Sequence, residues 1–483
     1  MLMLGVYNCW CLNHRVKAPL LAKKPWVIPA TFGVLAVLAL LAWFIFNPEN
    51  SVGLRIPGTD RGSDSEPGGT NAVLAGKVVL GDGQPADLPG AWTRFRGADN
   101  DAISKDSTKL SSKWQPGEPR EFWGIDAGEG YAGAAVQNGR VYVMDYDRDK
   151  RQDALRCLSL ANGREIWRYA YPVSVKRNHG MSRTVPALSG NSVVAMGPKC
   201  HVVCADATSG ELRWGLNLVR QFGATVPPWY AGQCPLIDGR NVILAPGGKE
   251  ALLVALDLES GKIVWQTPNP RGWKMTHSSI MPLEVNGVRM FVYSADKGVV
   301  GVAARNGALL WETGDWKISI ATVPSPLILS EGRIFLSGGY NAGSLMILIK
   351  REGEHFIPET LFKLGADVFG ATQHTPIAYE NHIYGVRADG KFVCLSFDGK
   401  VVWTSDSGQQ FGLGSFILAD GKIYAMNDTG LLRMIEATPG KYNLLGQAEV
   451  LKGRESWGPM ALAGGRLIVR DLTRMVCIDV AKH

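Results

Sequence analysis

The stretch Ser260-Gly261-Lys262-Ile263-Val264-Trp265 contains the phrase that decides the fold: a polar residue, Gly, any residue, two strand-type residues and Trp. The chain of 483 residues carries this phrase five times, ending at Trp167, Trp214, Trp265, Trp311 and Trp403. These Trp residues are 47, 51, 46 and 92 residues apart, and 92 is two steps of 46. A fixed period in this range is typical of a repeat architecture.

Each repeat predicts four short antiparallel strands. A polar-Gly pair between two apolar runs indicates a β-hairpin, because Gly readily adopts the positive φ of such turns. A second hairpin recurs upstream, with Gly before another apolar strand, as in Gly239-Arg240-Asn241-Val242-Ile243. No stretch after residue 92 shows convincing helical periodicity. Four-stranded units at this period indicate an all-β fold, the β-propeller, in which radial repetition protects the sheet edges.

The strand starts predict eight blades. Inner strands are expected to begin near Ala134, Val185, Cys234, Met281, Pro324, Thr375, Ser415 and Gly458. The last repeat ends at 475–479 without a Trp strand, whereas an isolated strand ending in Trp123 lies near the other end of the domain. We expect this early strand to complete the eighth blade and close the ring. Seven blades is the alternative, because two repeats lack the Trp phrase.

The repeated Trp residues are predicted to be structural. Trp buries a large apolar area, so this position should dominate the contact between neighbouring blades. The residues assigned to it are Trp123, Trp167, Trp214, Trp265, Trp311 and Trp403.

The N-terminal region predicts a membrane anchor. Residues 25–46 form one uncharged apolar run, long enough for a transmembrane helix. Basic residues precede it, which places the N-terminus in the cytoplasm and the propeller outside. The predicted domains are a cytoplasmic basic tail (1–24), a transmembrane signal-anchor (25–46), a flexible linker (47–90) with a short strand at 77–80, and the propeller (91–483). A cleaved signal peptide is the alternative.

The charge distribution argues against a nucleic-acid partner. The formal net charge is +7, and four of the basic residues lie in the first 24 positions, so the remainder is close to neutral. Nothing resembles a nucleic-acid motif, and no nucleic-acid partner is expected.

Four cysteines occupy equivalent strand positions on different blades: Cys157, Cys204, Cys394 and Cys477. Such positions are too far apart for disulfides, which indicates buried free thiols.

These residues resemble the PQQ-like β-propeller repeat family, which includes quinoprotein alcohol dehydrogenases and the propeller lipoprotein of the bacterial Bam assembly machine. The resemblance covers about residues 91–480, and an uncharacterised bacterial branch fits best. It is clearest from Arg183-Thr184-Val185-Pro186 to Gly261-Lys262-Ile263-Val264-Trp265. The opening Trp92-Thr93-Arg94-Phe95-Arg96-Gly97 is similar to a motif of large bacterial branches. The resemblance implies a location at the bacterial inner membrane, with the propeller in the periplasm or another extracytoplasmic space.

The resemblance also implies a rival function. Quinoprotein members bind PQQ with Ca²⁺ or a lanthanide over the central funnel and use an Asp base, often beside a vicinal disulfide. This chain has no adjacent cysteines and no Cys-x-x-Cys-His haem motif. No catalytic residue, cofactor or metal site is therefore predicted, and PQQ with Ca²⁺ is kept as the alternative.

One face of the propeller carries the candidate site. The loops that lead into the inner strands gather there, and loops on rigid scaffolds tend to carry function. The candidate ligand-binding residues are His179, Arg183, Trp229, Tyr230, Lys274, His277, His374 and Trp457. Aromatic rings beside Arg and His suit a planar or anionic ligand, or an extended peptide. The alternative is that these residues only pack the blades and cap the loops.

The sequence favours a membrane-anchored, extracytoplasmic propeller that serves as a binding or scaffold module for a protein or a small polar ligand. The alternative is a quinoprotein oxidoreductase acting on alcohols or sugars. Fold alone does not choose between them, because function depends on the site.

Overall fold

The computed structural model describes residues 27–46 and 71–483. The chain divides into two units, Met1–Thr59 and Asp60–His483. The first contains helix α1 (Val27–Phe46). Across the described residues, no helix meets the combined length and apolar character needed to cross a membrane. The predicted basic tail (1–24) and the first part of the predicted linker (47–70) lie outside the described residues. The membrane anchor therefore stays a prediction.

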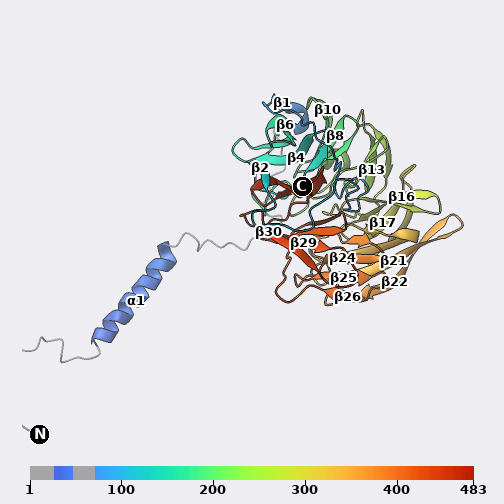
Figure 1. Ribbon diagram of the computed structural model, residues 1–483. Coiled ribbons are helices and arrows are strands. Elements are labelled where there is room, and N and C mark those ends of the chain that lie inside the picture. Colours follow the sequence, from blue (N-terminus) through green and yellow to red (C-terminus); the bar gives the residue numbers. More distant parts are fainter. Residues whose placement is uncertain (1–26, 47–70) are drawn as a thin grey trace, which may run out of the picture. The chain divides into compact units, whose positions relative to one another are not determined.

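Within residues 71–483 the chain forms eight antiparallel sheets, one for each blade of a β-propeller (Figure 1). Seven sheets have four strands, and the sheet of blade one has a fifth. The prediction of eight blades is confirmed, and the alternative of seven is wrong. A short helix, α2 (Leu218–Phe222), interrupts the strands after blade two.

The strands run in chain order through the blades. Blades one to four consist of β3 (Ala135–Gln137), β4 (Arg140–Asp147), β5 (Gln152–Ser159) and β6 (Glu165–Pro172); β7 (Ala187–Ser189), β8 (Ser192–Met196), β9 (His201–Asp206) and β10 (Leu212–Asn217); β11 (Leu236–Asp238), β12 (Asn241–Leu244), β13 (Leu253–Asp257) and β14 (Ile263–Thr267); and β15 (Met281–Val285), β16 (Val288–Ser294), β17 (Val299–Ala303) and β18 (Leu309–Thr313). Blades five to eight consist of β19 (Leu327–Ile328), β20 (Arg333–Gly338), β21 (Gly343–Glu352) and β22 (His355–Leu364); β23 (Ile377–Tyr379), β24 (His382–Val386), β25 (Phe392–Ser396) and β26 (Val401–Thr404); β27 (Phe416–Ala419), β28 (Lys422–Met426), β29 (Leu431–Glu436) and β30 (Leu444–Glu449); and β31 (Ala461–Ala463), β32 (Arg466–Arg470), β33 (Arg474–Asp479) and β2 (Glu121–Asp126).

Where the Gly-to-Trp phrase occurs, it joins one blade to the next. The Gly of one blade lies against the Trp ring of the preceding blade, and its positive φ forms the hairpin turn. An added Cβ would lie only 2.5 to 2.7 Å from that ring at Gly163, Gly210, Gly261 and Gly307. No larger residue fits without moving the ring, so the turn and the blade contact both require Gly.

The indole nitrogens of several of these Trp residues also reach across the junction. Each donates a hydrogen bond to a backbone carbonyl of the next blade: Trp123 to Leu160, Trp214 to Leu258, Trp265 to Ala304, and Trp403 to Thr438. Blade five lacks the phrase, and there Phe362 takes the same place, with its ring 2.8 Å from a Cβ built at Gly399.

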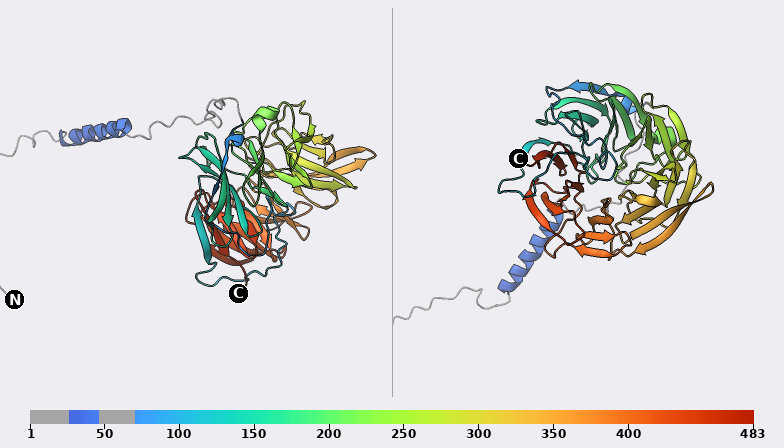
Figure 2. Two further views of the ribbon diagram at one scale, coloured as in Figure 1. Left: turned by 90° about the horizontal axis from the view of Figure 1, so that it is seen from above. Right: turned by 45° about the vertical axis from the view of Figure 1, so that its right-hand side comes forward.

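The fourth strand of the last blade, β2, comes from the other end of the domain. β2 pairs antiparallel with β33, with Trp123 opposite Cys477. Figure 2 shows the red C-terminal strands beside the blue-green strands of blade one, so the ring is closed. The predicted pairing is confirmed.

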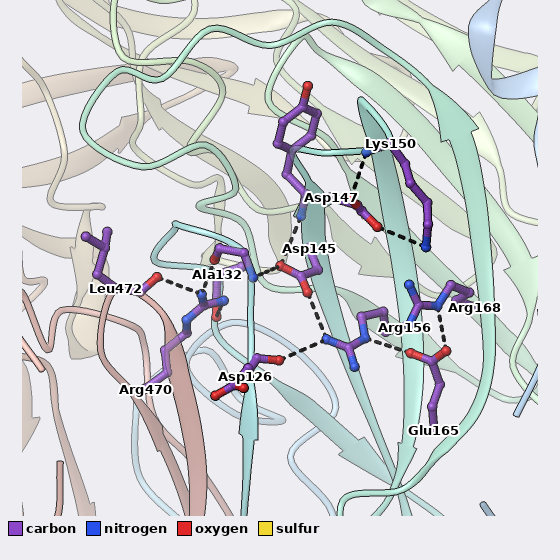
Figure 3. Close-up of polar contacts among 12 residues, drawn as sticks. Asp126, Ala132, Asp145, Asp147, Lys150, Arg156, Glu165, Arg168, Arg470 and Leu472 are labelled. Atoms are coloured by element: carbon purple, nitrogen blue, oxygen red, sulfur yellow. Dashed lines mark hydrogen bonds and ion pairs between the residues drawn. The ribbon is translucent and has the colours of Figure 1, made fainter. Parts of the chain in front are cut away.

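A polar network fixes the crossing from blade eight to blade one (Figure 3). Arg470, which is 1% exposed, donates to the carbonyls of Gly128 (2.9 Å) and Ala132 (3.3 Å). The carboxylate of Asp145 accepts from the backbone N–H of Gly128 (2.8 Å) and from Arg156 (2.8 Å). Contacts from both blades thereby fix residues 127–133, which connect β2 to β3.

The last part of the segment predicted as a flexible linker contains regular structure. Residues 71–90 belong to the propeller unit: Ala72–Ala75 forms a 3-10 helix and β1 (Lys77–Leu80) adds a fifth strand beside β6. Val73 is fully buried, and the Tyr169 hydroxyl donates to its carbonyl at 2.7 Å. The strand predicted at 77–80 is present as β1. The Gly- and Pro-rich composition gave no sign of its pairing with β6 or of the burial of Val73.

The cysteines of the propeller are buried free thiols: Cys157, Cys200, Cys204, Cys234, Cys394 and Cys477. Burial raises the pKa of the Cys157 and Cys204 thiols to about 12. They pack as small apolar residues in the strands.

We predict that Trp265→Ala, Trp214→Ala and Trp311→Ala each lower the free energy of unfolding by about 3–5 kcal/mol, because each opens a cavity between blades. Chemical denaturation measures the change. The control is Leu309→Ala, whose side chain is 46% exposed and whose loss should cost less than about 0.5 kcal/mol. Losses below about 1 kcal/mol for all three Trp variants would contradict their place in the blade contact.

The second prediction concerns ring closure. Arg470→Met should destabilise the fold by about 3–5 kcal/mol, because it leaves buried carbonyls at the closure without a donor. Arg474→Met is the matched control, since Arg474 pairs with Glu121 on the exposed rim of the same blade and such pairs contribute about 0–1 kcal/mol. Equal effects of the two variants would show that the buried network does not hold the ring closed.

Candidate functional site

The loops that lead into the inner strands place the predicted site residues on one face of the propeller. They lie between β6 and β7 (His179, Arg183), between α2 and β11 (Trp229, Tyr230), between β14 and β15 (Lys274, His277), between β22 and β23 (His374), and between β30 and β31 (Trp457). Five different blades therefore contribute to the predicted set.

A cavity of about 380 Å³ opens among these loops. All eight blades contribute residues to its lining, which places it on the propeller axis. We call it the axial cup. Of the eight predicted residues, the structure brings six to its lining: His179, Arg183, Trp229, His277, His374 and Trp457.

Tyr230 and Lys274 do not line the cup. Tyr230 is buried, and its hydroxyl donates to the carbonyl of Lys176 at 2.6 Å. Lys274 is exposed outside the cup, where its backbone N–H donates to the Asp296 carboxylate at 2.7 Å. Tyr230 thus braces a loop, and the Lys274 side chain faces solvent.

The floor of the cup comes from the segment 92–104, which we call the plug. It crosses the axis from blade one to blade seven. Trp92 exchanges two backbone hydrogen bonds with Val136 of β3, and Leu418 of β27 bonds to both Ala102 and Ser104. Between these ends, the Thr93 carbonyl accepts a hydrogen bond from the backbone N–H of Leu188 in blade two. The Arg94 guanidinium donates one to the carbonyl of Ile237 in blade three.

Arg96 anchors the plug to blade six. Its guanidinium donates to the carbonyls of Thr375 (2.8 Å), Pro376 (2.8 Å) and Asn100 (3.0 Å), and it is 7% exposed. Burial lowers the pKa of Arg96 to about 10, so it stays a cation at neutral pH. All three guanidinium nitrogens bond to backbone carbonyls.

Arg183 is likewise bound to carbonyls. Its Nε donates to Trp229 (2.6 Å) and its Nη2 to His179 (2.7 Å) and Asn178 (3.2 Å). The guanidinium lies over the Tyr131 ring, 4.9 Å from its centroid. Arg183 therefore ties the loop of blade two to the loop of blade three, and Arg183→Ala is expected to disturb the wall of the cup.

Aromatic rings form much of the wall beside Arg183. Trp457 stacks on Tyr131 with centroids 5.3 Å apart, and its indole N–H donates to Asp428 at 2.7 Å. The Tyr131 hydroxyl donates to the carboxylate of Glu455. Trp229 lies beside the ring of His277, with centroids 6.3 Å apart. The two carboxylates hold aromatic rings in place and do not line the cup.

Two histidines of the lining are neutral at pH 7. Burial lowers the pKa of His277 to about 3 and that of His374 to about 4. Each ring bonds to backbone, His277 at Trp229 and Tyr230 and His374 at Gly412, whereas each Nε2 is buried without a hydrogen-bond partner among the described residues. A buried polar atom without a partner is costly, and both Nε2 atoms are enclosed by protein and do not face the cup.

The lining does not fit PQQ with Ca²⁺. Ca²⁺ binds six to eight oxygen ligands, several of them carboxylates, and no Asp, Glu or Asn lines the axial cup. Within the described parts of the chain, no group of three or more His, Cys, Asp or Glu is placed to hold a metal. An Asp general base is also lacking from the lining.

Sequence reasoning missed the plug and Tyr131. The motif Trp92-Thr93-Arg94-Phe95-Arg96-Gly97 stood out in the sequence, but its fold back across the axis depends on contacts with five blades. Trp92, Phe95, Arg96 and Tyr131 all line the cup. The signal that could have indicated the plug is its position, since it lies between two strands that end up in blades one and eight.

Solved structures share the fold at low sequence identity. BamB from Moraxella catarrhalis matches at 14% identity over 74% of this chain and 99% of that chain, with a TM-score of 0.52. A europium-containing methanol dehydrogenase matches at 11% identity over 79% of this chain and 89% of that chain, with a TM-score of 0.58. Such identities establish the fold only. No curated protein matches the chain by sequence.

A protein-family model described as outer membrane protein assembly factor BamB matches residues 104–226 and 201–355. These ranges together span more than half of the 483 residues. With its eight blades and repeated Gly-to-Trp junctions, the chain belongs to this family of PQQ-like propellers.

Proposed function

We propose that this protein is a binding module that holds a ligand in the axial cup, outside the cytoplasm and tethered to the bacterial inner membrane through residues 25–46. The observation that carries the proposal is the plug. A propeller that served only as a scaffold would need no floor across its axis, whereas the plug turns the channel into a cup lined by aromatic rings.

The arrangement of polar groups supports a ligand site over a packing role. Carboxylates outside the lining hold Trp457 and Tyr131 in fixed positions. The Gln373 amide and the Arg183 guanidinium lie on the lining among the aromatic rings. Ligand pockets combine apolar walls with a few polar groups in this way.

The alternative is a quinoprotein oxidoreductase acting on alcohols or sugars. The fold is shared with a methanol dehydrogenase, and a fold hosts many functions. The lack of carboxylates in the lining disfavours this alternative, because neither a Ca²⁺ ligand set nor a general base is present there.

We predict that the full chain, purified in detergent from its own cells, carries a small molecule in native mass spectrometry. Val323→Trp should abolish the adduct, because Val323 lines the cup and a larger side chain fills it. Lys274→Ala is the control and should keep the adduct, since Lys274 lies outside the cup.

Two outcomes would contradict the proposal. An adduct that survives Val323→Trp unchanged would place the ligand elsewhere. Uptake of added PQQ with Ca²⁺, followed by reduction of an artificial electron acceptor, would favour the oxidoreductase.

The tether has its own prediction. In intact spheroplasts, protease added outside should leave residues 1–24 uncut and reach the segment between the anchor and the propeller, because basic flanks stay on the cytoplasmic side. Mass spectrometry of the protected fragment identifies its ends. Mature protein that begins after residue 46 would replace the anchor with a cleaved signal peptide.

A further inference from the structure

Two hydrogen-bond donors on the lining of the axial cup are open to a ligand. Arg183 donates through Nε to the Trp229 carbonyl and through Nη2 to carbonyls of its own loop, which leaves Nη1 without a partner among the described residues. The indole N–H of Trp229 makes no hydrogen bond to them either, and neither nitrogen is enclosed by protein. Both residues line the cup. Trp92 on the floor has a third such N–H, but it is 2% exposed and offers a ligand little surface.

The other open side chains of the lining can donate as well as accept. His179, Tyr340 and Gln373 line the cup, and their side chains make no hydrogen bond to the described residues. An imidazole, a phenol and an amide each carry both kinds of atom. No carboxylate lines the cup. The open groups therefore favour a ligand that brings hydrogen-bond acceptors.

The charge of the lining favours an anion. Arg96 bonds to carbonyls through all three guanidinium nitrogens and contributes only its charge. Burial lowers the pKa of Arg183 to about 10, although the nearby Tyr131, Glu455 and Tyr230 oppose this shift. The protein around Arg183 therefore does not replace all the solvation that the cation has lost, and a bound anion would compensate for it.

The nearest carboxylates lie behind the aromatic wall. Glu455 accepts a hydrogen bond from the Tyr131 hydroxyl. Asp428 accepts from the Trp457 indole N–H at 2.7 Å and from the backbone N–H of Leu413 at 2.8 Å. Neither carboxylate lines the cup. A ligand inside the cup therefore meets the guanidinium of Arg183 and not these two acids.

The number of open donors indicates the kind of anion. Arg183 and Trp229 are neighbours, because Nε of Arg183 donates to the Trp229 carbonyl at 2.6 Å. The two open groups, Nη1 and the indole N–H, match the two oxygens of one carboxylate, and the hydrogen bond from the guanidinium is charge-assisted. A phosphate would bring a third oxygen and a second charge, and burying these without further donors is costly.

The rest of the lining suits a flat apolar body. Trp457 lines the cup and stacks on Tyr131, and the rings of Phe95 and Phe416 also line it. Aromatic faces of this kind stack against flat apolar groups. The cavity of about 380 Å³ lies toward the small end of ligand pockets, which hold about 300–1,000 Å³. The plug closes the axis below it, so a small ligand fits.

We infer that the axial cup binds a small organic anion that carries a single carboxylate on a flat apolar body and needs no metal ion. The carboxylate accepts hydrogen bonds from Nη1 of Arg183 and from the indole N–H of Trp229, and the body stacks on the ring of Trp457. This inference rests on the proposed binding function and names the ligand class of the same site.

The test uses the full chain in detergent, with EDTA to remove divalent cations, and three probes that share one flat body. 2-Naphthoate carries a carboxylate, 2-naphthamide is its neutral analogue, and 2-naphthyl phosphate carries a second charge. Isothermal titration calorimetry measures binding, with detergent alone as the blank. We expect 2-naphthoate to bind roughly tenfold more tightly than either of the others, because its one charge and two oxygens match the open donors.

Two variants locate the contact. Trp229→Phe keeps an aromatic face and the carbonyl that Arg183 uses but removes the indole N–H, so 2-naphthoate affinity should fall roughly three- to tenfold, the effect of one lost hydrogen bond. Arg183→Gln keeps a side-chain donor for the loop carbonyls and removes the charge, so the preference for 2-naphthoate over 2-naphthamide should disappear. If Arg183→Gln does not fold, Trp229→Phe decides. Trp316→Phe is the matched control, since Trp316 is buried in the core of blades four and five and does not line the cup.

The pH dependence separates Arg183 from the histidines. The pKa of Arg183 is about 10, and those of His277 and His374 are about 3 and 4. None of these groups changes its charge between about pH 6 and pH 8.5, and the 2-naphthoate carboxyl is ionised throughout this range. The affinity should therefore change less than about twofold. A steep fall as the pH rises through this range would show that a protonated imidazole holds the carboxylate, and it would overturn the role of Arg183.

The remaining outcomes separate this inference from the proposed function. If 2-naphthamide binds as tightly as 2-naphthoate and Val323→Trp abolishes both, the cup is a ligand site and the carboxylate inference is wrong. If 2-naphthyl phosphate binds most tightly, the inference of a single carboxylate is wrong. If 2-naphthoate binds equally to wild type and to Val323→Trp, it binds elsewhere and the inference fails. If no probe binds, the inference is overturned, and the native adduct then decides the proposed function alone.

Discussion

The pairing of β2 with β33 is the constraint on which the rest of the structure depends. It joins residues 121–126 to residues 474–479 and converts eight stacked sheets into a closed ring. A propeller blade buries its faces only against neighbours, so an open ring would expose the inner face of blades one and eight. Arg470 and Asp145 then fix the chain as it crosses from one of these blades to the other.

Closure also builds the candidate site. The crossing segment 127–133 carries Tyr131, the ring on which Trp457 stacks. Because β2 belongs to blade eight and β3 to blade one, the chain before β2 is free to run across the axis as the plug. The wall and the floor of the axial cup therefore have the same origin: β2 precedes β3 to β6 of blade one in the sequence but belongs to the last blade.

The recurring Gly and Trp residues made the architecture predictable, whereas the site was predictable only in part. Gly261 and Trp214 meet at one blade junction, and their recurrence in the sequence reports that contact directly. His277, His374 and Trp457 were identifiable because they precede inner strands, whose loops share one face. The role of Arg183 was not identifiable, since its carbonyl partners come from loops whose paths the sequence does not specify. The strand at 77–80 was identifiable, but its pairing with β6 and the anchoring of Arg96 to blade six depend on contacts far along the chain, which no local pattern encodes.

The central claim is that the plug is a fixed floor of a closed ring. Native-state hydrogen exchange of the full chain tests it most directly, residue by residue. The backbone N–H groups of Trp92, Ala102 and Ser104 bond within the plug or to inner strands, and the account predicts that they exchange as slowly as those of β3 and β27. Exchange of these three amides at the rate of exposed turns, with slow exchange kept in the inner strands, would contradict the account, because the axis would then be an open channel.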